Sequence, residues 1–385
     1  MKFKLKESVL IFLVVMSLFV MTACSGNEST VVDTNQDTSV EESKQDKEVP
    51  TIVISWGKSL HTGMMQLNFI KPEIFENNPV HLRPIGDKQL ELVKDGEVLA
   101  IFDYVVNDGG SHAATMMTQG TLDISYNSST AIISAYDVGA DLSIICPVQS
   151  GGVSIVASAD APYDDFEGLV EFAKNSEEPI RGGYHSPVSS PRVVLEYSLR
   201  EAGLDVSENT ADYDADVLLT DLKGLTNLIP SMSSGQVELW AGPVPHPQNA
   251  EDQNIGKIIA SLDELPGGEW IDFPCCTMNV RNEIVEKYPE VIEALIQATK
   301  DSFEYAENNK EETAELMAEY VGLDKEVLMK NDTTYGVEIS DKFINGMEKY
   351  YEVMTDMDKF TGRLENKTFD EAMDLLFDLS FFENN

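Results

Sequence analysis

Short apolar runs rich in β-branched residues alternate with helical segments along most of this chain. Such runs occur at 51–56, 122–126 and 142–148, and each is followed by glycine or small polar residues. Segments with a helical period lie at 130–138 and 191–202. Strands that are separated by helices form parallel sheets with helices packed on their faces. The alternation therefore predicts an α/β fold with parallel sheets.

The length of this region predicts two lobes. A single hydrophobic core stops growing at ~250–300 residues, and residues 50–385 exceed that size. From residue 281 onward helical segments replace the alternation. The expected helices lie at 282–308, 310–320, 342–354 and 369–377, with a further one starting at Asp324. We therefore expect a helical C-terminal cover on an α/β body.

The N-terminal residues carry signals for export. Lysines in the first six residues precede an apolar block at 9–20, which is too short for the ~20 residues that span a bilayer. This pattern predicts a signal peptide at 1–23. Cys24 follows Met21-Thr22-Ala23, which resembles the lipobox of bacterial lipoproteins. The resemblance implies an extracytoplasmic protein, anchored to the cell membrane by a lipid on Cys24. Residues 24–49 are polar and predict a flexible linker.

The charge of the chain excludes two classes of partner. It has 67 acidic and 27 basic residues, giving a formal net charge of −40. Nucleic acids and anionic lipid surfaces select basic patches, so neither is an expected partner. A chain of this charge is expected to be a soluble monomer. The net charge does not define the ligand, because one local pocket can oppose the global sign.

Three cysteines remain after Cys24: Cys146, Cys275 and Cys276. Three thiols in an exported domain cannot form a disulfide framework. A bridge from Cys146 to one of the adjacent pair remains an alternative to three buried thiols that behave as small apolar residues.

Residues 90–102 alternate between apolar and polar side chains around the pair Asp95-Gly96. An Asp-Gly pair between two alternating runs is a strong hairpin signal. We expect an antiparallel arm within 86–109, inserted after a short strand at 81–84. The sequence assigns this arm no function.

Four polar loops follow predicted strands, at 57–63, 127–130, 149–152 and 184–191. Ligands of open α/β sheets bind at the carboxyl ends of the strands. Hydroxyls and backbone N–H groups at helix N-termini bind anions there. The same residue types are also common helix caps and turns. For each single loop the structural role is the alternative, but the four loops together favour a binding site.

Several segments resemble the solute-binding proteins of ABC transporters of the nitrate/sulfonate/taurine type. The matching elements, in chain order, are 120–129, 139–142, 149–152, 234–238, 242–247, 273–280 and 288–295. They cover roughly residues 50–330. The family's Gly-rich segment is absent from 72–117, where the hairpin stands, so the resemblance leaves the solute open.

The resemblance implies a type II periplasmic-binding-protein fold. It consists of two α/β lobes joined by two hinge crossings, with helices at the C-terminus. The implied divisions are 50–152 for the first part of lobe 1, 153–274 for lobe 2, and 275–385 for the return to lobe 1. Such a receptor closes around a small solute and presents it to a membrane permease.

Carried over residue by residue, the resemblance implies a ligand site between the lobes. Lobe 1 and the first crossing would contribute Ser59, His61, Thr62, Asn127, Ser128, Ser129, Ser150 and Gly151. Lobe 2 and the second crossing would contribute Tyr184, His185, Ser186, Ser189, Pro243 and His246. Trp56 and Tyr126 end their strands and would stack on a flat ligand, or else belong to the edge of the core.

Two ligand classes remain open within this family. A sulfonate or nitrate needs hydroxyl and amide donors with a cation, here Lys58, Arg192 or protonated His61. A heteroaromatic ligand needs stacking partners instead. Trp56 followed by His61-Thr62-Gly63 is similar to the first-strand region of proteins that bind the pyrimidine precursor of thiamine.

Two alternatives lie outside this class of receptor. A metal receptor would use His61, His185 and His246 near Cys275-Cys276, but the chain contains no HxxxH or CxxC spacing. An enzyme would need a nucleophile and a base, but no GxSxG, GxGxxG, P-loop or HExxH motif is present. We therefore predict a protein that is not an enzyme and has no cofactor.

Overall fold

The structure is a computed structural model and describes residues 48–382. The predicted signal peptide at 1–23, the lipidation of Cys24 and nearly all of the linker at 24–49 lie outside the described residues. Residues 48–385 form one compact unit. Among the described helices, none combines the length and the hydropathy that crossing a bilayer requires.

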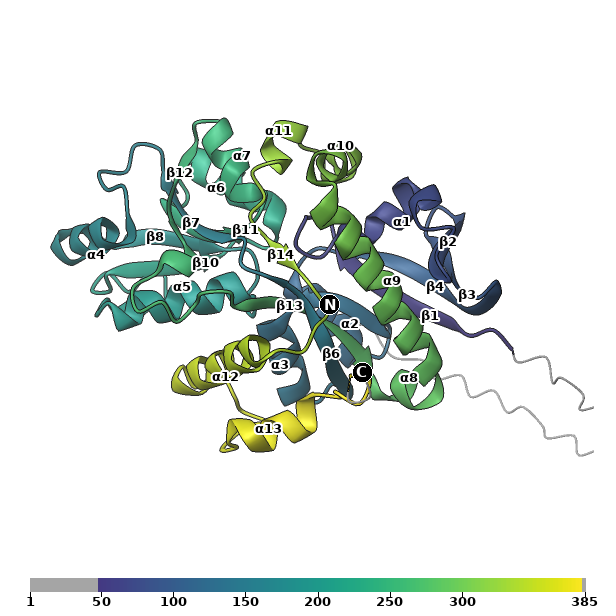
Figure 1. Cartoon of the computed structure of the whole chain (residues 1–385). Coiled ribbons are helices and arrows are strands. Elements are labelled where there is room, and N and C mark those ends of the chain that lie inside the picture. The colour runs from purple at the N-terminus through teal and green to yellow at the C-terminus, as the bar shows by residue number, and fades with distance from the viewer. Residues whose placement is uncertain (1–47, 383–385) are drawn as a thin grey trace, which may run out of the picture. The chain divides into compact units, whose positions relative to one another are not determined.

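The first of two sheets has eight strands in the order β14-β6-β13-β5-β1-β4-β3-β2 (Figure 1). The strands are β1 (Thr51–Gly57), β2 (Val80–Gly86), β3 (Gln89–Lys94), β4 (Glu97–Asn107), β5 (Ile124–Ser128), β6 (Leu142–Ser150), β13 (Pro274–Arg281) and β14 (Thr334–Tyr335). β1 pairs in parallel with β4 and β5, whereas β13 is antiparallel to both β5 and β6.

The second sheet has six strands in the order β12-β7-β11-β8-β10-β9. The strands are β7 (Val153–Ser158), β8 (Ile180–Tyr184), β9 (Val206–Ser207), β10 (Val217–Asp221), β11 (Leu239–Pro243) and β12 (Gly256–Ser261). β8 pairs in parallel with β10 and β11, and β7 is antiparallel to β11 and β12. The prediction of parallel sheets is therefore wrong where β7 pairs with β11 and β12 and where β13 pairs with β5 and β6. β7 and β13 each follow a crossing from the other sheet. Each therefore enters its new sheet at the end where the neighbouring parallel strands finish, and runs antiparallel to them.

Two connections join the sheets. The first crossing is the pair Gly151-Gly152 between β6 and β7, and both glycines have positive φ, 68° and 66°. The second crossing, 262–273, returns the chain from β12 to β13. The predicted lobe boundaries stay a prediction, since residues 48–385 form one compact unit.

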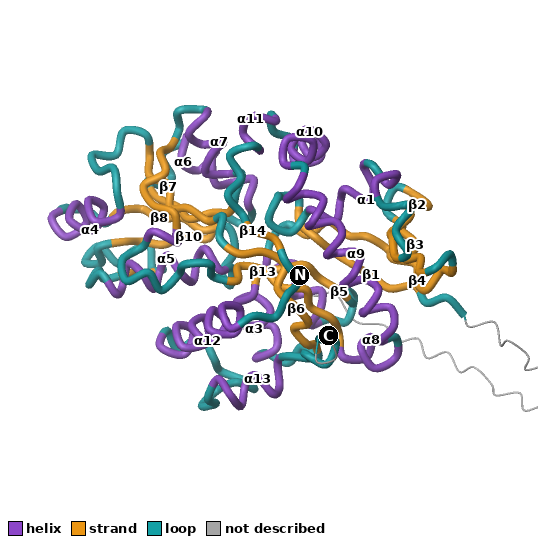
Figure 2. Tube along the Cα trace, in the orientation of Figure 1, coloured by secondary structure: helices purple, strands orange, loops and turns teal. Residues whose placement is uncertain are grey.

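Helices surround the strands of both sheets (Figure 2). They are α1 (Leu67–Ile70), α2 (Gly110–Thr118), α3 (Ser129–Asp137), α4 (Phe166–Asn175), α5 (Ser190–Glu201), α6 (Leu228–Ser233), α7 (His246–Asp252), α8 (Asn282–Lys287), α9 (Pro289–Asn308), α10 (Lys310–Val321), α11 (Lys325–Leu328), α12 (Asp341–Asp356) and α13 (Phe369–Leu376). In the C-terminal part, α9 packs on β2, β3 and β4, while α12 contacts β13 and α13 contacts β6.

The predicted helix at 282–308 is two helices. α8 ends before Tyr288, whose backbone leaves the helical region (φ −136°, ψ 52°), and α9 begins at Pro289. The proline ring disfavours the helical conformation of the residue before it. Pro289 therefore starts a new helix, where the sequence prediction had placed it within the first turn of a longer one.

The hairpin is confirmed, but its second strand is not part of an inserted arm. β3 and β4 pair in antiparallel fashion around Asp95-Gly96, both of which have positive φ. β4 continues beyond the hairpin and pairs in parallel with β1 over residues 101–107. Leu90 and Leu92 are fully buried. The hairpin thus extends the first sheet, and the end of β4 lies beside the end of β1.

Candidate functional site

A small cavity lies where strands of both sheets end. Its lining residues come from the ends of five strands and the loops beside them: Gly57, Ser59, His61, Thr62, Asn107, Gly109, Gly110, Asn127, Ser128, His185, Ser189, Pro191, Leu225, Pro243, Cys275 and Cys276. The cavity has a volume of about 50 Å³, several times the ~10–15 Å³ that one water molecule requires. It can hold a small solute or an ion.

Three helices of eight or more residues begin at this cavity. Their N-caps are Gly109 for α2, Ser128 for α3 and Ser189 for α5, and all three residues line the cavity. Neither Ser128 nor Ser189 caps a backbone N–H of its own helix with its side chain, and Gly109 has no side chain. The N-terminus of a helix carries partial positive charge and unpaired N–H groups. The three helix ends therefore contribute positive potential to the cavity wall.

One hydroxyl joins the starts of α3 and α5 across the two sheets. Ser128 Oγ accepts a hydrogen bond of 2.9 Å from the backbone N–H of Ser190 and lies 3.0 Å from its Oγ. Ser190 Oγ in turn donates to the carbonyl of Cys275, at 3.1 Å. These contacts therefore hold the start of α3, the start of α5 and the start of β13 against one another.

The loop after β1 is folded tightly against its own backbone. Thr62 Oγ1 accepts a hydrogen bond from the N–H of Gly57 at 2.9 Å, and the N–H of Gly63 donates to the carbonyl of Ser59. A Cβ on Gly63 would lie 2.4 Å from that carbonyl oxygen, so only glycine fits. This turn directs His61 toward the first crossing.

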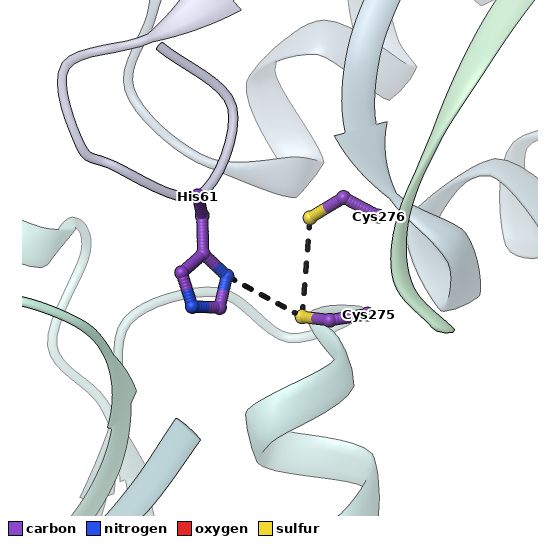
Figure 3. A group of neighbouring side chains, drawn as sticks. All are labelled: His61, Cys275 and Cys276. Carbon is purple, nitrogen blue, oxygen red and sulfur yellow. Dashed lines mark hydrogen bonds between the residues drawn. The ribbon is translucent and has the colours of Figure 1, made fainter. Parts of the chain in front are cut away.

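His61 is buried, and its hydrogen bonds define its tautomer. Nε2 lies 2.6 Å from the carbonyl oxygen of Gly152, and a carbonyl only accepts, so Nε2 carries the proton. Nδ1 then keeps its lone pair. It accepts from Gln149 Nε2 at 3.0 Å and lies 3.6 Å from Cys275 Sγ (Figure 3).

The adjacent thiols of Cys275 and Cys276 lie on the same side of β13 as His61. Their sulfurs are 3.9 Å apart, and both cysteines are buried. Burial opposes ionisation of Cys275, but the hydrogen bond from Cys276 and the imidazole of His61 outweigh it, so its pKa lies below the usual value. The Cys275 sulfur and burial raise the pKa of Cys276 well above its usual value. The pair therefore favours one negative charge over two.

Two further histidines lie nearby and are neutral, His185 buried and His246 partly buried. Burial, with the imidazoles of His246 and His61, lowers the pKa of His185 to about 3. Burial and His61 lower the pKa of His246 to about 4. His185 lines the cavity, and its Nδ1 has no hydrogen-bond partner among the described residues. His246 begins α7 and does not itself line the cavity.

The structure brings together half of the predicted site. Eight predicted residues line the cavity: Ser59, His61, Thr62, Asn127, Ser128, His185, Ser189 and Pro243. Ser129, Ser150, Gly151, Tyr184, Ser186 and His246 lie outside its lining. Several of these make structural hydrogen bonds instead. Ser129 donates to the carbonyl of Pro274, and Tyr184 donates to Glu208.

The two predicted stacking aromatics belong to the core. Trp56 and Tyr126 are fully buried. The Trp56 ring stacks on Tyr104 at 4.1 Å between centroids, and its Nε1 donates to Gln66. The Tyr126 hydroxyl bonds to Thr299 at 2.6 Å. Neither ring faces the cavity in the described structure.

The predicted cations also lie elsewhere. Arg192 forms a buried ion pair with Glu196 at 2.6 Å and a second ion pair with the exposed Glu208 at 2.7 Å. Lys58 is exposed and does not line the cavity. Among the described residues that line it there is no lysine or arginine.

Sequence reasoning missed the contribution of the loop after β4. Asn107, Gly109 and Gly110 line the cavity, and the Asn107 side chain donates to Ser55 Oγ on β1. The run Asn107-Asp108-Gly109-Gly110 is as polar and small as the loops that were selected. It was overlooked because residues 86–109 were assigned to an arm and not to a parallel strand with a functional end.

Comparisons with known proteins identify the family. The model of the NMT1-like family matches residues 97–322, more than half of the chain. The chain belongs to the NMT1-like family. A nitrate import ATP-binding protein, NrtC, from Synechocystis is 22% identical over 319 residues. The alignment covers 80% of this chain and 43% of that protein, so this NMT1-like chain spans less than half of its relative.

Solved structures show the fold of this NMT1-like protein. The periplasmic nitrate-binding protein NrtA from Synechocystis has a TM-score of 0.66 at 14% identity, covering 87% of this chain and 88% of that one. The alkanesulfonate-binding protein SsuA from Xanthomonas axonopodis, bound to MOPS, has a TM-score of 0.61 at 14% identity, covering 81% and 94%. The predicted periplasmic-binding-protein fold is confirmed.

Proposed function

We propose that this protein is the extracytoplasmic receptor of an ABC importer, anchored by a lipid on Cys24, and that it captures a small oxyanionic solute. The observation that carries the proposal is the convergence of three helix N-termini, of α2, α3 and α5, on one cavity between the two sheets. Aligned N–H groups and the positive helix ends favour an anion there.

Membership of the NMT1-like family and the likeness to nitrate- and sulfonate-binding proteins support the same class of solute. The hydroxyl of Ser59 and the amides of Asn107 and Asn127 add neutral donors. A flat heterocycle receives less support, because Trp56 and Tyr126 are packed in the core. The importer's permease is the proposed protein partner, and the receptor acts as a monomer.

The proposal assigns a role to the two sheets. Each supplies one wall of the cavity, and the crossings at 151–152 and 262–273 allow the walls to separate for entry of the solute. A ligand that contacts both walls stabilises the state in which they are together.

Thermal unfolding with nitrate, methanesulfonate and taurine tests the class of solute. A ligand present at 100 times its Kd stabilises the folded state by about 2.7 kcal/mol, so the melting temperature should rise. A rise with none of the three anions, but with a neutral heterocycle, would contradict the proposal.

A charge variant sharpens this test. Ser189→Asp replaces the N-cap residue of α5 with another residue type that is preferred at N-caps, and it places a carboxylate at the cavity. We expect an intact fold and loss of anion binding. The matched control is Ser340→Asp at the N-cap of α12, outside the lining, which should bind as the wild type does. Equal anion affinity of both variants would place the solute elsewhere.

A further inference from the structure

Three side chains with metal-binding atoms converge in the wall of the cavity. The ligand atoms of His61, Cys275 and Cys276 all lie within 4.8 Å of one another, and all three residues are buried (Figure 3). They come from two distant parts of the chain, the loop after β1 and the start of β13. The role proposed above, an anion held by helix N-termini, leaves these two thiols and the imidazole unused.

The distances match the edges of a metal coordination polyhedron. Zinc bonds of ~2.3 Å to sulfur and ~2.0–2.1 Å to nitrogen at tetrahedral angles place two sulfurs roughly 3.8 Å apart and a sulfur and a nitrogen roughly 3.6 Å apart. The sulfurs of Cys275 and Cys276 are 3.9 Å apart, and Cys275 Sγ is 3.6 Å from His61 Nδ1. An ion can therefore enter between these atoms with little movement of the side chains.

A β-bulge makes this convergence of adjacent cysteines possible. Successive side chains of a regular strand point to opposite faces. The pairing of β13 with β6 shifts register between Pro274 and Cys276, and again between Cys276 and Thr277. A bulge re-aims a side chain locally, and here both sulfurs point toward His61. Their separation is far beyond the ~2.05 Å of a disulfide.

The imidazole is already oriented as a metal ligand. Metal-binding histidines donate their second ring N–H to a carbonyl or carboxylate, which fixes the tautomer. His61 Nε2 donates to the carbonyl of Gly152 at 2.6 Å, and Nδ1 faces the sulfurs with its lone pair. The partner atom lies in the first crossing, so the orientation of this ligand depends on the connection between the two sheets.

We propose that His61, Cys275 and Cys276 bind a Zn²⁺ ion in the cavity wall, with its fourth coordination position open toward the solute. Three protein ligands with one open position is the arrangement of zinc sites that bind a further small ligand. The role of the open position rests on the proposed function: the ion supplies the positive charge that the lining residues lack, and it contacts the anionic group of the solute. Thiolates exclude harder ions such as Mg²⁺ and Ca²⁺.

Metal titration of the reduced, metal-free full chain tests the site without relying on transport. Zn²⁺ binding is measured by competition with a chromophoric chelator, and Co²⁺ is the spectroscopic probe. We expect one equivalent of Zn²⁺ and a thiolate-to-cobalt charge-transfer band. Cys275→Ser, Cys276→Ser and His61→Gln should each weaken Zn²⁺ binding by more than about 100-fold, beyond the 10–100-fold typical of changes to the groups that orient ligands.

The matched control is Cys146→Ser, a buried thiol on β6 outside the cluster, which should bind Zn²⁺ as the wild type does. Equal Zn²⁺ affinity of the cluster variants and the wild type would overturn the site. So would a stable Cys275–Cys276 disulfide in place of metal binding. His61→Gln also guards against a folding artefact, since circular dichroism should show an unchanged fold.

Measurements of anion binding distinguish the receptor proposal from the zinc-site proposal. Nitrate and methanesulfonate affinities are measured with and without Zn²⁺, and tighter anion binding in the Zn²⁺ form supports the open position. Zn²⁺ binding with no anion binding in either form would contradict the receptor proposal. The metal site would stand, but not its contact with an anionic solute. Anion binding that is equal in both forms would keep the receptor and overturn the open coordination position.

Discussion

Both crossings connect one sheet to the other, but different kinds of contact hold them in place. The first is only two residues long, and its backbone is fixed by hydrogen bonds: Gly152 accepts from His61, and Gly151 accepts from Gln149. The second, 262–273, is fixed by packing, with Trp270 and Phe273 against Tyr350. The comparison teaches that the first crossing is tied to the cavity, whereas the second is tied to the core.

Loss of Trp270 should have the largest effect on stability. Its side chain is 2% exposed and contacts the rings of Tyr197, Phe273 and Tyr350. Trp270→Ala should lower the free energy of unfolding by about 3–5 kcal/mol, because it leaves a large cavity. Denaturant unfolding measures the loss, and Trp270→Phe is the control that keeps an aromatic ring. A loss below about 1 kcal/mol would contradict a crossing held by packing.

A single methyl group added to the first crossing should lower the stability of the protein. A Cβ on Gly152 would lie 2.2 Å from Thr333 Oγ1 and 3.0 Å from His61 Nε2, in a backbone with φ of 66°. Gly152→Ala should therefore cost about 2 kcal/mol or more, combining a left-handed backbone cost of ~1–2 kcal/mol with the clash.

Gly151→Ala is the matched control for this prediction. It has the same backbone conformation, φ 68°, but its nearest neighbour, Asp263 Oδ2, is at 3.3 Å. It should cost only the backbone term, about 1 kcal/mol. Equal losses for the two variants would mean that Thr333 and His61 move aside freely, and that the first crossing does not fix His61.

The smallest effect is expected at the start of the second crossing, and it depends on pH. Burial, then the charges of Asp272 and Asp332, raise the pKa of Asp263 to about 6. A folded-state pKa above the unfolded value of ~3.9 means that stability is lost as pH rises from about 4 through 6. Asp263→Asn should thus stabilise the protein at pH 7.5 by about 1 kcal/mol, after allowance for partial solvent exposure, and have no effect near pH 4. Unfolding curves at both pH values measure it; a variant less stable than wild type at pH 7.5 would contradict the assignment.

Local signals in the sequence were sufficient for most elements but not for their pairing. The strand at Thr51–Gly57, the Asp95-Gly96 turn and the end of α10 at Gly322 follow from short-range preferences of β-branched residues and glycine. The direction of β13 did not follow, because it depends on where the chain returns from the second sheet. Similarly, the break at Tyr288 follows only if Pro289 is taken as the first residue of a new helix, and not as a proline within the first turn of a longer one.

The candidate site shows the same division. Loops chosen for small polar residues after strands line the cavity, as Ser59 and Asn127 do. Trp56 was placed at the strand end correctly, but its partner Tyr104 comes from β4, a neighbour that the sequence did not reveal. Cys275 and Cys276 converge with His61 only because of a bulge in β13. Alternation along a strand would have assigned the two sulfurs to opposite faces.

The contact between Ser128 and Ser190 has an electrostatic consequence. It holds the positive ends of α3 and α5 close together, and two like partial charges repel each other. An anion bound between the two helix ends is attracted to both of them, and these attractions offset the repulsion. The anion thus acts as a counterion in the cavity. The same geometry therefore penalises an empty, assembled cavity and rewards an occupied one. Under the proposed function, the difference between the loaded and the empty state would then begin at two serine hydroxyls.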